Sequence, residues 1–435
     1  MSLLPRVAIG TLQAESMLAP VHWALLDVLA GAGVQTQCFQ SRACFTPFDG
    51  ATAVTGLKPR HLDSWLMSRD FCREIFFRAA RTCDLAVVDG SLAPGESGLS
   101  TLCEWLDLPR MAVLDVLSIS QNGWPVTPFG VDGIILDRVR DDQHADEITT
   151  RIATRWNLPV LGWLEELPVL REIVAALSPG SPPSRELCAA LGRKLATHFQ
   201  RKAFLNLAAR RSFGEVPNIS ETNCTASVEP LHVAIAFDEA FHCYFPDMLD
   251  LLELRGAIVR DFSPLHDETL PANTDIVYLG CGHPHAFAEA LSQNHCLMAA
   301  IRNHVFSGKR VYAESGGLAY LCRELQLPDG TSFPMVGAIP ATARLNPTPT
   351  PPRPVELSLV ASSWLGPTGE TIRGYLNTMW EVEPAGPSLT TFAAERNGSH
   401  EMVGRRQAIG SRLHLHLAAL PGCLQRFWKP VPVSV

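Results

Sequence analysis

Cysteine and histidine side chains gather in one short segment of the chain, Cys281-Gly282-His283-Pro284-His285. Both residue types are ligands that zinc prefers in proteins. The pattern has low specificity, because it is only a short C-x-H-x-H and Pro284 stiffens the turn. The sequence therefore favours no metal site here, and zinc binding stays the alternative.

Two more histidines alternate with leucine in His414-Leu415-His416-Leu417. This alternation is typical of a strand with both histidines on one face. Histidine is also an axial ligand of haem-type macrocycles. One hypothesis is therefore that a tetrapyrrole binds through such a histidine.

The elements of the first half alternate between apolar and amphipathic segments. The apolar segment Arg6 to Thr11 is followed by an amphipathic segment, Val21 to Ala32, closed by Gly33, which predicts strand, turn and helix. Helix-like segments separate several further apolar segments, namely Asp84 to Asp89, Arg110 to Asp115, Val131 to Leu136 and Pro159 to Trp163. Such alternation predicts an α/β fold with a parallel sheet covered on both faces, and a ligand beyond the carboxyl ends of the strands.

The alternation is interrupted and then restarts, which predicts two domains. A Pro/Ser/Gly cluster lies at Ser178 to Ser184, and a polar stretch from Phe213 to Glu229 is typical of a linker, so we place the boundary near residue 225. The second half should contain strands at Leu231 to Phe237, Asp275 to Leu279 and Arg310 to Glu314, and helices at Pro246 to Leu254 and Ala286 to Leu291. The predicted domains are residues 1–225 and 230–435.

Composition excludes several classes of partner. Of the 435 residues 46% are hydrophobic and 18% charged, which is typical of a well-buried globular protein. A net charge of -8 provides no basic surface for nucleic acid. We see no apolar run near the ~20 residues that a membrane span requires. The twelve cysteines are scattered and no secretory signal precedes Arg6, so we expect reduced thiols and a cytoplasmic protein.

Two long segments of the second half resemble the glutamine amidotransferase domain of cobyrinate a,c-diamide synthases. They are the segment beginning AFDEAFHCYF at Ala236 and the segment RVYAESGGLAYL from Arg310 to Leu321. Weaker similarity in register covers the first half, at Gly10-Thr11, TAVTGLKPRHLDSWLM, DLAVVDG and IILDRV. The resemblance implies a P-loop NTPase-like domain of the dethiobiotin synthetase kind, followed by a class I glutamine amidotransferase-like domain.

The family is a carbon-nitrogen ligase of cobalamin biosynthesis that amidates two carboxylates of a corrin precursor with ATP, Mg²⁺ and glutamine. The resemblance places Ser315 at the nucleophile position, where the family has cysteine, and His414 at the general base. The oxyanion turn would comprise Gly280, Gly282 and Gly316, and the nucleotide site Gly10, Thr11 and Asp89.

The phosphate loop departs from the family pattern. A phosphate cradle needs glycines for close backbone approach, a lysine for the phosphate charge and a hydroxyl for Mg²⁺. Where the family has two glycines, lysine and threonine, this chain has Ala14, Ser16, Met17 and Leu18, and Glu15 adds a negative charge. These residues disfavour ATP binding. Asp89 could still hold Mg²⁺, or it could cap the following turn.

The amidotransferase half departs as well. A serine nucleophile needs a more precisely oriented base than a cysteine, which a histidine readily converts to the thiolate. Cys281 interrupts the glycine turn, and the stretch from Arg373 to Trp380 replaces a family motif that carries two histidines and a glutamate. These residues disfavour glutamine hydrolysis. Gly316 and Gly317 do not favour it, because a tight turn needs glycines at these positions with or without activity.

Two hypotheses about function remain. The first is a tetrapyrrole a,c-diamide synthase. The second is a catalytically degenerate homologue that binds a tetrapyrrole such as a corrinoid, or that acts as a partner subunit in a homodimer or with another protein.

Overall fold

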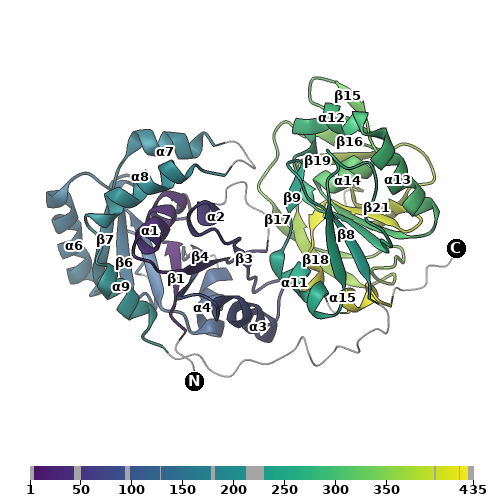
Figure 1. Cartoon of the computed structure of the whole chain (residues 1–435). Helices are drawn as coiled ribbons and strands as arrows, with labels where there is room; N and C mark the ends of the chain where they lie inside the picture. Colours follow the sequence, from purple (N-terminus) through teal and green to yellow (C-terminus); the bar gives the residue numbers. More distant parts are fainter. Residues whose placement is uncertain are drawn as a thin grey trace. The chain divides into compact units, whose positions relative to one another are not determined.

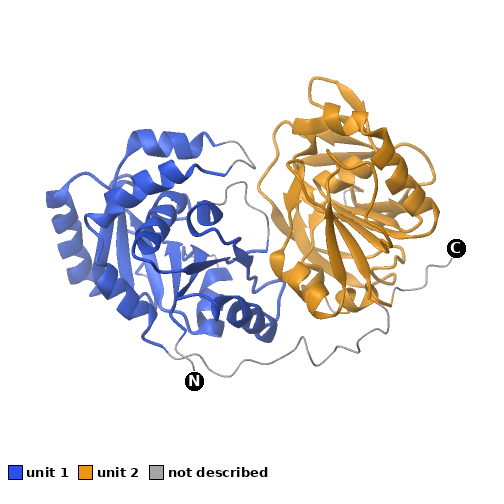
Figure 2. Cartoon of the chain, in the orientation of Figure 1, with its two compact units in different colours: residues 1–222 blue, residues 223–435 orange. Residues whose placement is uncertain are grey.

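The computed structural model divides into two compact units, residues 1–222 and 223–435 (Figure 2). It describes residues 4–43, 50–93, 98–127, 129–177, 182–211, 230–395, 398–420 and 422–429. The predicted boundary near residue 225 and the whole predicted linker lie outside these ranges, as do residues 178–181 of the Pro/Ser/Gly cluster.

The first unit is built on a seven-stranded parallel sheet of order β3-β2-β4-β1-β5-β6-β7 (Figure 1). Its strands are β1 (Arg6–Thr11), β2 (Thr36–Gln40), β3 (Arg60–His61), β4 (Leu85–Ser91), β5 (Arg110–Asp115), β6 (Gly133–Val139) and β7 (Val160–Glu165). Its helices are α1 (Ala19–Gly31), α2 (Gly50–Thr55), α3 (Arg69–Ala80), α4 (Gly98–Leu106), α5 (Val116–Asn122), α6 (Asp142–Trp156), α7 (Pro168–Ala175), α8 (Arg185–Ala196) and α9 (Arg201–Ala208). The predicted parallel α/β fold is confirmed.

Alternate residues of the central strands enter two different cores. In β5, Met111 and Val113 join a core cluster with residues of α1, α8 and α9, whereas Ala112 and Leu114 join a second cluster with residues of α6. Because successive side chains of a strand point to opposite faces, both faces of this sheet are buried. This burial explains why its strands are continuous apolar runs in the sequence.

The second unit has a seven-stranded mixed sheet of order β10-β8-β11-β13-β22-β21-β20. The first five strands pair in parallel, and the β22–β21 and β21–β20 pairs are antiparallel. Its strands are β8 (His232–Ala236), β10 (Ile258–Phe262), β11 (Ile276–Leu279), β13 (Arg310–Glu314), β20 (Thr390–Ala394), β21 (His400–Arg405) and β22 (Ala408–Ser411). The predicted second α/β domain is confirmed.

Smaller sheets and helices complete the second unit. The sheets are β12 (Cys281–Gly282) with β9 (Phe241–Cys243), then β14 (Glu324–Gln326), β15 (Ser332–Pro334), β16 (Ala341–Leu345) and β19 (Trp380–Pro384), and finally β17 (Arg353–Ser358), β18 (Thr371–Leu376) and β23 (Leu413–His414). The helices are α11 (Pro246–Leu254), η1 (Pro284–Phe287), α12 (Ala288–Gln293), α13 (His295–Phe306), α14 (Gly316–Leu321), η2 (Leu417–Ala419) and α15 (Cys423–Arg426). The strand predicted through Leu417 is wrong beyond His414, because β23 ends at His414 and η2 begins at Leu417.

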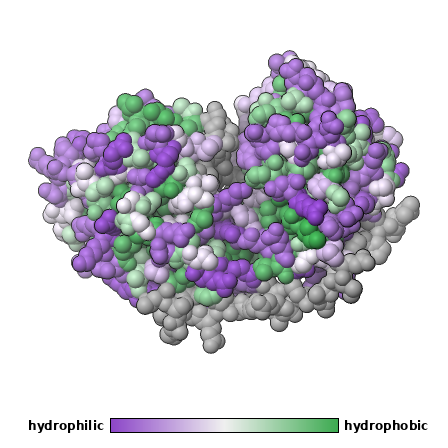
Figure 3. Space-filling view, viewed as in Figure 1, coloured by the Kyte–Doolittle hydropathy of each residue, from purple (hydrophilic) through white to green (hydrophobic). Residues whose placement is uncertain are grey.

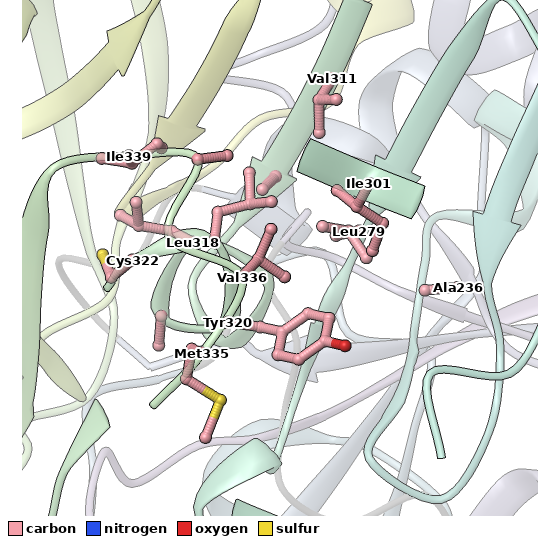
Figure 4. Packing of buried hydrophobic residues seen from close by; sticks show 14 of the residues in the cluster. Ala236, Leu279, Ile301, Val311, Leu318, Tyr320, Cys322, Met335, Val336 and Ile339 are labelled. Atoms are coloured by element: carbon pink, nitrogen blue, oxygen red, sulfur yellow. The ribbon is translucent and has the colours of Figure 1, made fainter. Parts of the chain in front are cut away.

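Helix α14 is the centre of the second unit's core (Figure 4). Leu318 and Tyr320 of this helix are fully buried and belong to one cluster with Leu279 of β11 and Ile301 of α13. This packing fixes the start of α14, where the chain leaves β13.

Hydrophilic residues are interspersed with smaller apolar areas on the face shown in Figure 3. Among the helices of the described residues, none is long and apolar enough to cross a membrane.

Candidate functional site

The turn between β13 and α14 holds Ser315 in a strained backbone conformation. Its φ of 47° and ψ of -105° lie in a region that residues other than glycine rarely adopt. The Ser315 amide donates to the Ser411 carbonyl at 2.8 Å, which ties the turn to β22. A Cβ on Gly316 would lie 2.7 Å from Pro284 Cδ, and one on Gly317 would lie 2.3 Å from the Leu279 carbonyl oxygen. The sharp elbow therefore depends on both glycines.

The glycine turn from Gly280 to Gly282, which includes β12, is closely packed against Ala240 and the start of β9. A Cβ on Gly282 would lie 2.0 Å from the Ala240 carbonyl oxygen, so only glycine fits there. The Gly280 amide donates to the Tyr244 hydroxyl at 2.9 Å. This amide, one of the predicted oxyanion groups, is thus already hydrogen-bonded within the protein.

Asn377, which follows β18, lies between Ser315 and His414. Its Nδ2 is 3.2 Å from Ser315 Oγ and 3.0 Å from His414 Nε2. The Met379 amide donates to Asn377 Oδ1 at 2.8 Å, which identifies the atom facing Ser315 and His414 as the amide nitrogen. The predicted nucleophile and base are therefore brought to one place, with an amide donor between them.

Cys281 lies against the other nitrogen of His414. Its Sγ is 2.9 Å from His414 Nδ1 and 3.9 Å from Glu314 Oε2. Because Asn377 donates to Nε2, the ring proton of neutral His414 is on Nδ1 and points at Cys281. Glu314 Oε1 in turn accepts from the Tyr312 hydroxyl at 2.7 Å and from the Leu415 amide at 3.3 Å.

Complete burial sets the protonation states of this cluster. Burial raises the pKa of the Glu314 carboxyl to about 8. Burial, with Glu314 nearby, raises the pKa of the Cys281 thiol well above its ordinary value. Burial also lowers the pKa of His414 to about 4, as it does for His416. At neutral pH the carboxyl, thiol and imidazole groups of this cluster are thus mainly uncharged.

Acid should destabilise the second unit through His416. Its pKa is lowered from 6.5 to about 4 in the folded chain, so the folded state binds fewer protons than the unfolded state between these values. The stabilisation is present above pH 6.5 and is lost as pH falls toward 4, by about 3 kcal/mol. Urea unfolding at pH 7 and pH 4.5 should show a smaller loss for His416→Asn than for the unchanged chain. His266→Asn, which removes an exposed histidine, is the control; an equal loss in both variants would contradict the expectation.

The predicted nucleotide residues lie at the carboxyl end of the first unit's sheet. Gly10 and Thr11 are the last residues of β1. In the loop that follows, Ser16 Oγ donates to Asp115 Oδ2 at 3.0 Å, and Gln13 Nε2 donates to the Asp115 carbonyl oxygen at 3.0 Å. The loop is therefore held by side-chain contacts to the end of β5.

Asp89 lies in β4, where it pairs in register with Ile9 of β1. His22 Nδ1 of helix α1 is 3.2 Å from Asp89 Oδ2. The carboxylate that could hold Mg²⁺ thus contacts a histidine, a partner that the sequence analysis did not predict.

Sequence reasoning missed Asn377 and the grouping of Cys281 with Glu314 and His414. The sequence shows that the family motif is replaced between Arg373 and Trp380, but nothing in this stretch indicates the position of Asn377. Among the described residues, Cys281, Glu314 and His414 form a group whose ligand atoms lie within 4.8 Å of one another and could hold a metal ion. The alternative metal segment considered from sequence paired Cys281 with His283 and His285 instead.

Comparisons with known proteins find one matching domain family and distant relatives that cover most of the chain. Residues 232–421 match the CobB/CobQ-like glutamine amidotransferase domain. The chain is 26% identical to a cobyrinate a,c-diamide synthase of Syntrophotalea carbinolica over 97% of this chain and 98% of that protein. It is 27% identical to the cobyrinate a,c-diamide synthase of Salmonella typhimurium over 93% of both chains. It is 28% identical to a hydrogenobyrinate a,c-diamide synthase of Streptomyces coelicolor over 98% and 97% of the two chains.

Proposed function

Because the chain is distantly homologous over its full length to cobyrinate a,c-diamide synthases and carries a CobB/CobQ-like glutamine amidotransferase domain, we propose that it is a degenerate homologue of these synthases. In this proposal it keeps the scaffold for a corrin-type tetrapyrrole or for a partner protein. It neither hydrolyses glutamine nor uses ATP.

The position of Asn377 carries this proposal. A nucleophilic hydroxyl must give its proton to the histidine during attack. Asn377 instead donates its amide protons to both Ser315 Oγ and His414 Nε2, and it occupies the place of that proton transfer. Loss of the cysteine and insertion of an amide donor each remove a different requirement of glutamine hydrolysis.

The first unit supports the same proposal. The loop after β1 has no lysine, and the side chains of Gln13 and Ser16 bond to Asp115. Glu15 is exposed in this loop and would repel a phosphate. These residues lack the charge that a triphosphate requires.

The direct test is a turnover assay. Purified protein receives ATP, Mg²⁺, glutamine and cobyrinic acid, and the release of ADP and glutamate is followed, with the Salmonella typhimurium synthase as positive control. We expect no turnover above background, but a saturable change in cobyrinic acid absorbance if the tetrapyrrole is bound. Glutamate or ADP release above background would overturn the degenerate assignment and indicate an active diamide synthase.

A cysteine placed at the elbow should show the effect of Asn377. In Ser315→Cys the new thiol faces the Asn377 side-chain amide and not His414 Nε2. Iodoacetamide should therefore alkylate it at the slow rate of a buried thiol without a neighbouring base. In Ser315→Cys/Asn377→Ala the thiol can meet His414 Nε2, and its alkylation should be about tenfold faster, the effect of one pKa unit. The rates are measured by mass spectrometry of the peptide containing residue 315. Equal rates in the two variants would show that Asn377 does not separate the two groups.

A further inference from the structure

We propose that Cys281, Glu314 and His414 form a binding site for a divalent transition metal ion, with zinc as the best match. The three residues come from β12, the end of β13 and β23, and their ligand atoms lie within 4.8 Å of one another. Thiolate, carboxylate and imidazole are the three ligand types that zinc takes in proteins.

Two of the three distances between the ligand atoms are close to those of a tetrahedral site. Zinc bond lengths of about 2.0 to 2.3 Å would separate the ligand atoms by roughly 3.3 to 3.6 Å. Cys281 Sγ lies 2.9 Å from His414 Nδ1 and 3.9 Å from Glu314 Oε2. Shifts of about half an ångström, of opposite sense in the two pairs, would bring both pairs to these separations. The ligand atoms of Glu314 and His414 lie within 4.8 Å of each other.

The hydrogen bonds around Glu314 orient it for a metal. Tyr312 and the Leu415 amide both donate to Oε1, which leaves Oε2 facing Cys281. Hydrogen bonds from neighbouring groups to a ligand side chain orient the ligands of metal sites in this way. Three protein ligands leave a fourth position for water or another small ligand, as in catalytic zinc sites.

Charge balance favours an ion in this buried place. Cys281, Glu314 and His414 are all at most 4% exposed. One dication with one thiolate and one carboxylate has no net charge, whereas an isolated charge would be costly to bury. On binding, the Cys281 thiol and the Glu314 carboxyl each release a proton to solvent, and the His414 ring proton moves from Nδ1 to Nε2.

After that proton movement, the contact between Asn377 and His414 disfavours metal binding. The metal-bound ring needs an acceptor at Nε2, but Asn377 presents its amide nitrogen there, because its Oδ1 accepts from the Met379 amide. An aspartate at this position would accept from both the Met379 amide and the His414 ring, as in carboxylate–histidine–zinc arrangements. Asn377→Asp should therefore tighten metal binding by about 10-fold to 100-fold.

Cobalt(II) titration of the full chain tests the proposal. We expect one equivalent to bind, with a near-ultraviolet thiolate-to-cobalt charge-transfer band and tetrahedral visible bands that zinc abolishes. Cys281→Ser should lose the charge-transfer band. Cys243→Ser is the matched control. Cys243 is the register partner of Cys281 in the β9–β12 ladder, but it does not belong to the proposed ligands. This variant should keep the charge-transfer band.

Circular dichroism of each variant is the check that it is folded. Absence of stoichiometric cobalt binding, or a band that survives in Cys281→Ser, would overturn the site. Unchanged or weaker binding in Asn377→Asp would overturn it too, and this variant does not depend on loss of a ligand. These experiments measure metal binding and not glutamine hydrolysis, so this proposal can fail or hold independently of the proposed function.

Discussion

Replacing Gly317 with alanine should cost the second unit about 3 kcal/mol or more of its free energy of unfolding, beyond the usual range for an overpacked methyl group. The new Cβ would lie 2.3 Å from the Leu279 carbonyl oxygen and 2.8 Å from Leu279 Cβ. Leu279 cannot withdraw cheaply, because β11 lies between β8 and β13 and hydrogen-bonds to both. The only relief is movement of α14, which carries the fully buried Leu318 and Tyr320.

Urea unfolding followed by hydrogen exchange measures this effect. The midpoint should fall, and faster exchange should be confined to peptides of β11, β13 and α14. Gly31→Ala is the control, because a Cβ built at this position has no atom within 4 Å apart from its chain neighbours and the backbone of its own helix. That variant should be neutral or slightly more stable, by up to about 1 kcal/mol. A Gly317→Ala chain with an unchanged midpoint would show that the elbow tolerates a side chain and that its glycines do not fix Ser315.

The elements of both sheets could be predicted because each has a local cause. The strand predicted at Arg310 to Glu314 and the helix predicted at Pro246 to Leu254 have the same bounds in the structure. A run of apolar residues, a proline at the first helical position or a pair of glycines acts within a few residues of chain. The α/β class followed from this repetition.

The contacts of the site could not be predicted because they join distant parts of the chain. Asn377 is 62 residues from Ser315, and Cys281 is 133 residues from His414. Their types are ordinary in the local sequence, and only the packing of β12, β18 and β23 brings them together. The resemblance pointed to the places where chemistry was replaced, but not to what the new residues contact.

Arg138→Met should lower the stability of the first unit by about 3 kcal/mol, the cost of leaving a buried charge without its partner. Asp115 is 1% exposed, and Arg138 holds its carboxylate through two nitrogens. Ser16 and the Ser118 amide also donate to this carboxylate, but neither carries a charge to balance it. The loop after β1 and the start of α5 should loosen together, since both depend on Asp115.

A double variant separates the charge from the packing. Asp115→Asn/Arg138→Met removes both charges and should be more stable than Arg138→Met alone by about 1 to 3 kcal/mol. Arg151→Met, which breaks an exposed pair with Glu147 on α6, should change stability by less than about 0.5 kcal/mol. Unfolding midpoints of the four chains, with hydrogen exchange in β5 and β6, give the comparison. If the double variant is no more stable than Arg138→Met, the cost lies in lost packing of the arginine stem, and the loop after β1 does not depend on the ion pair.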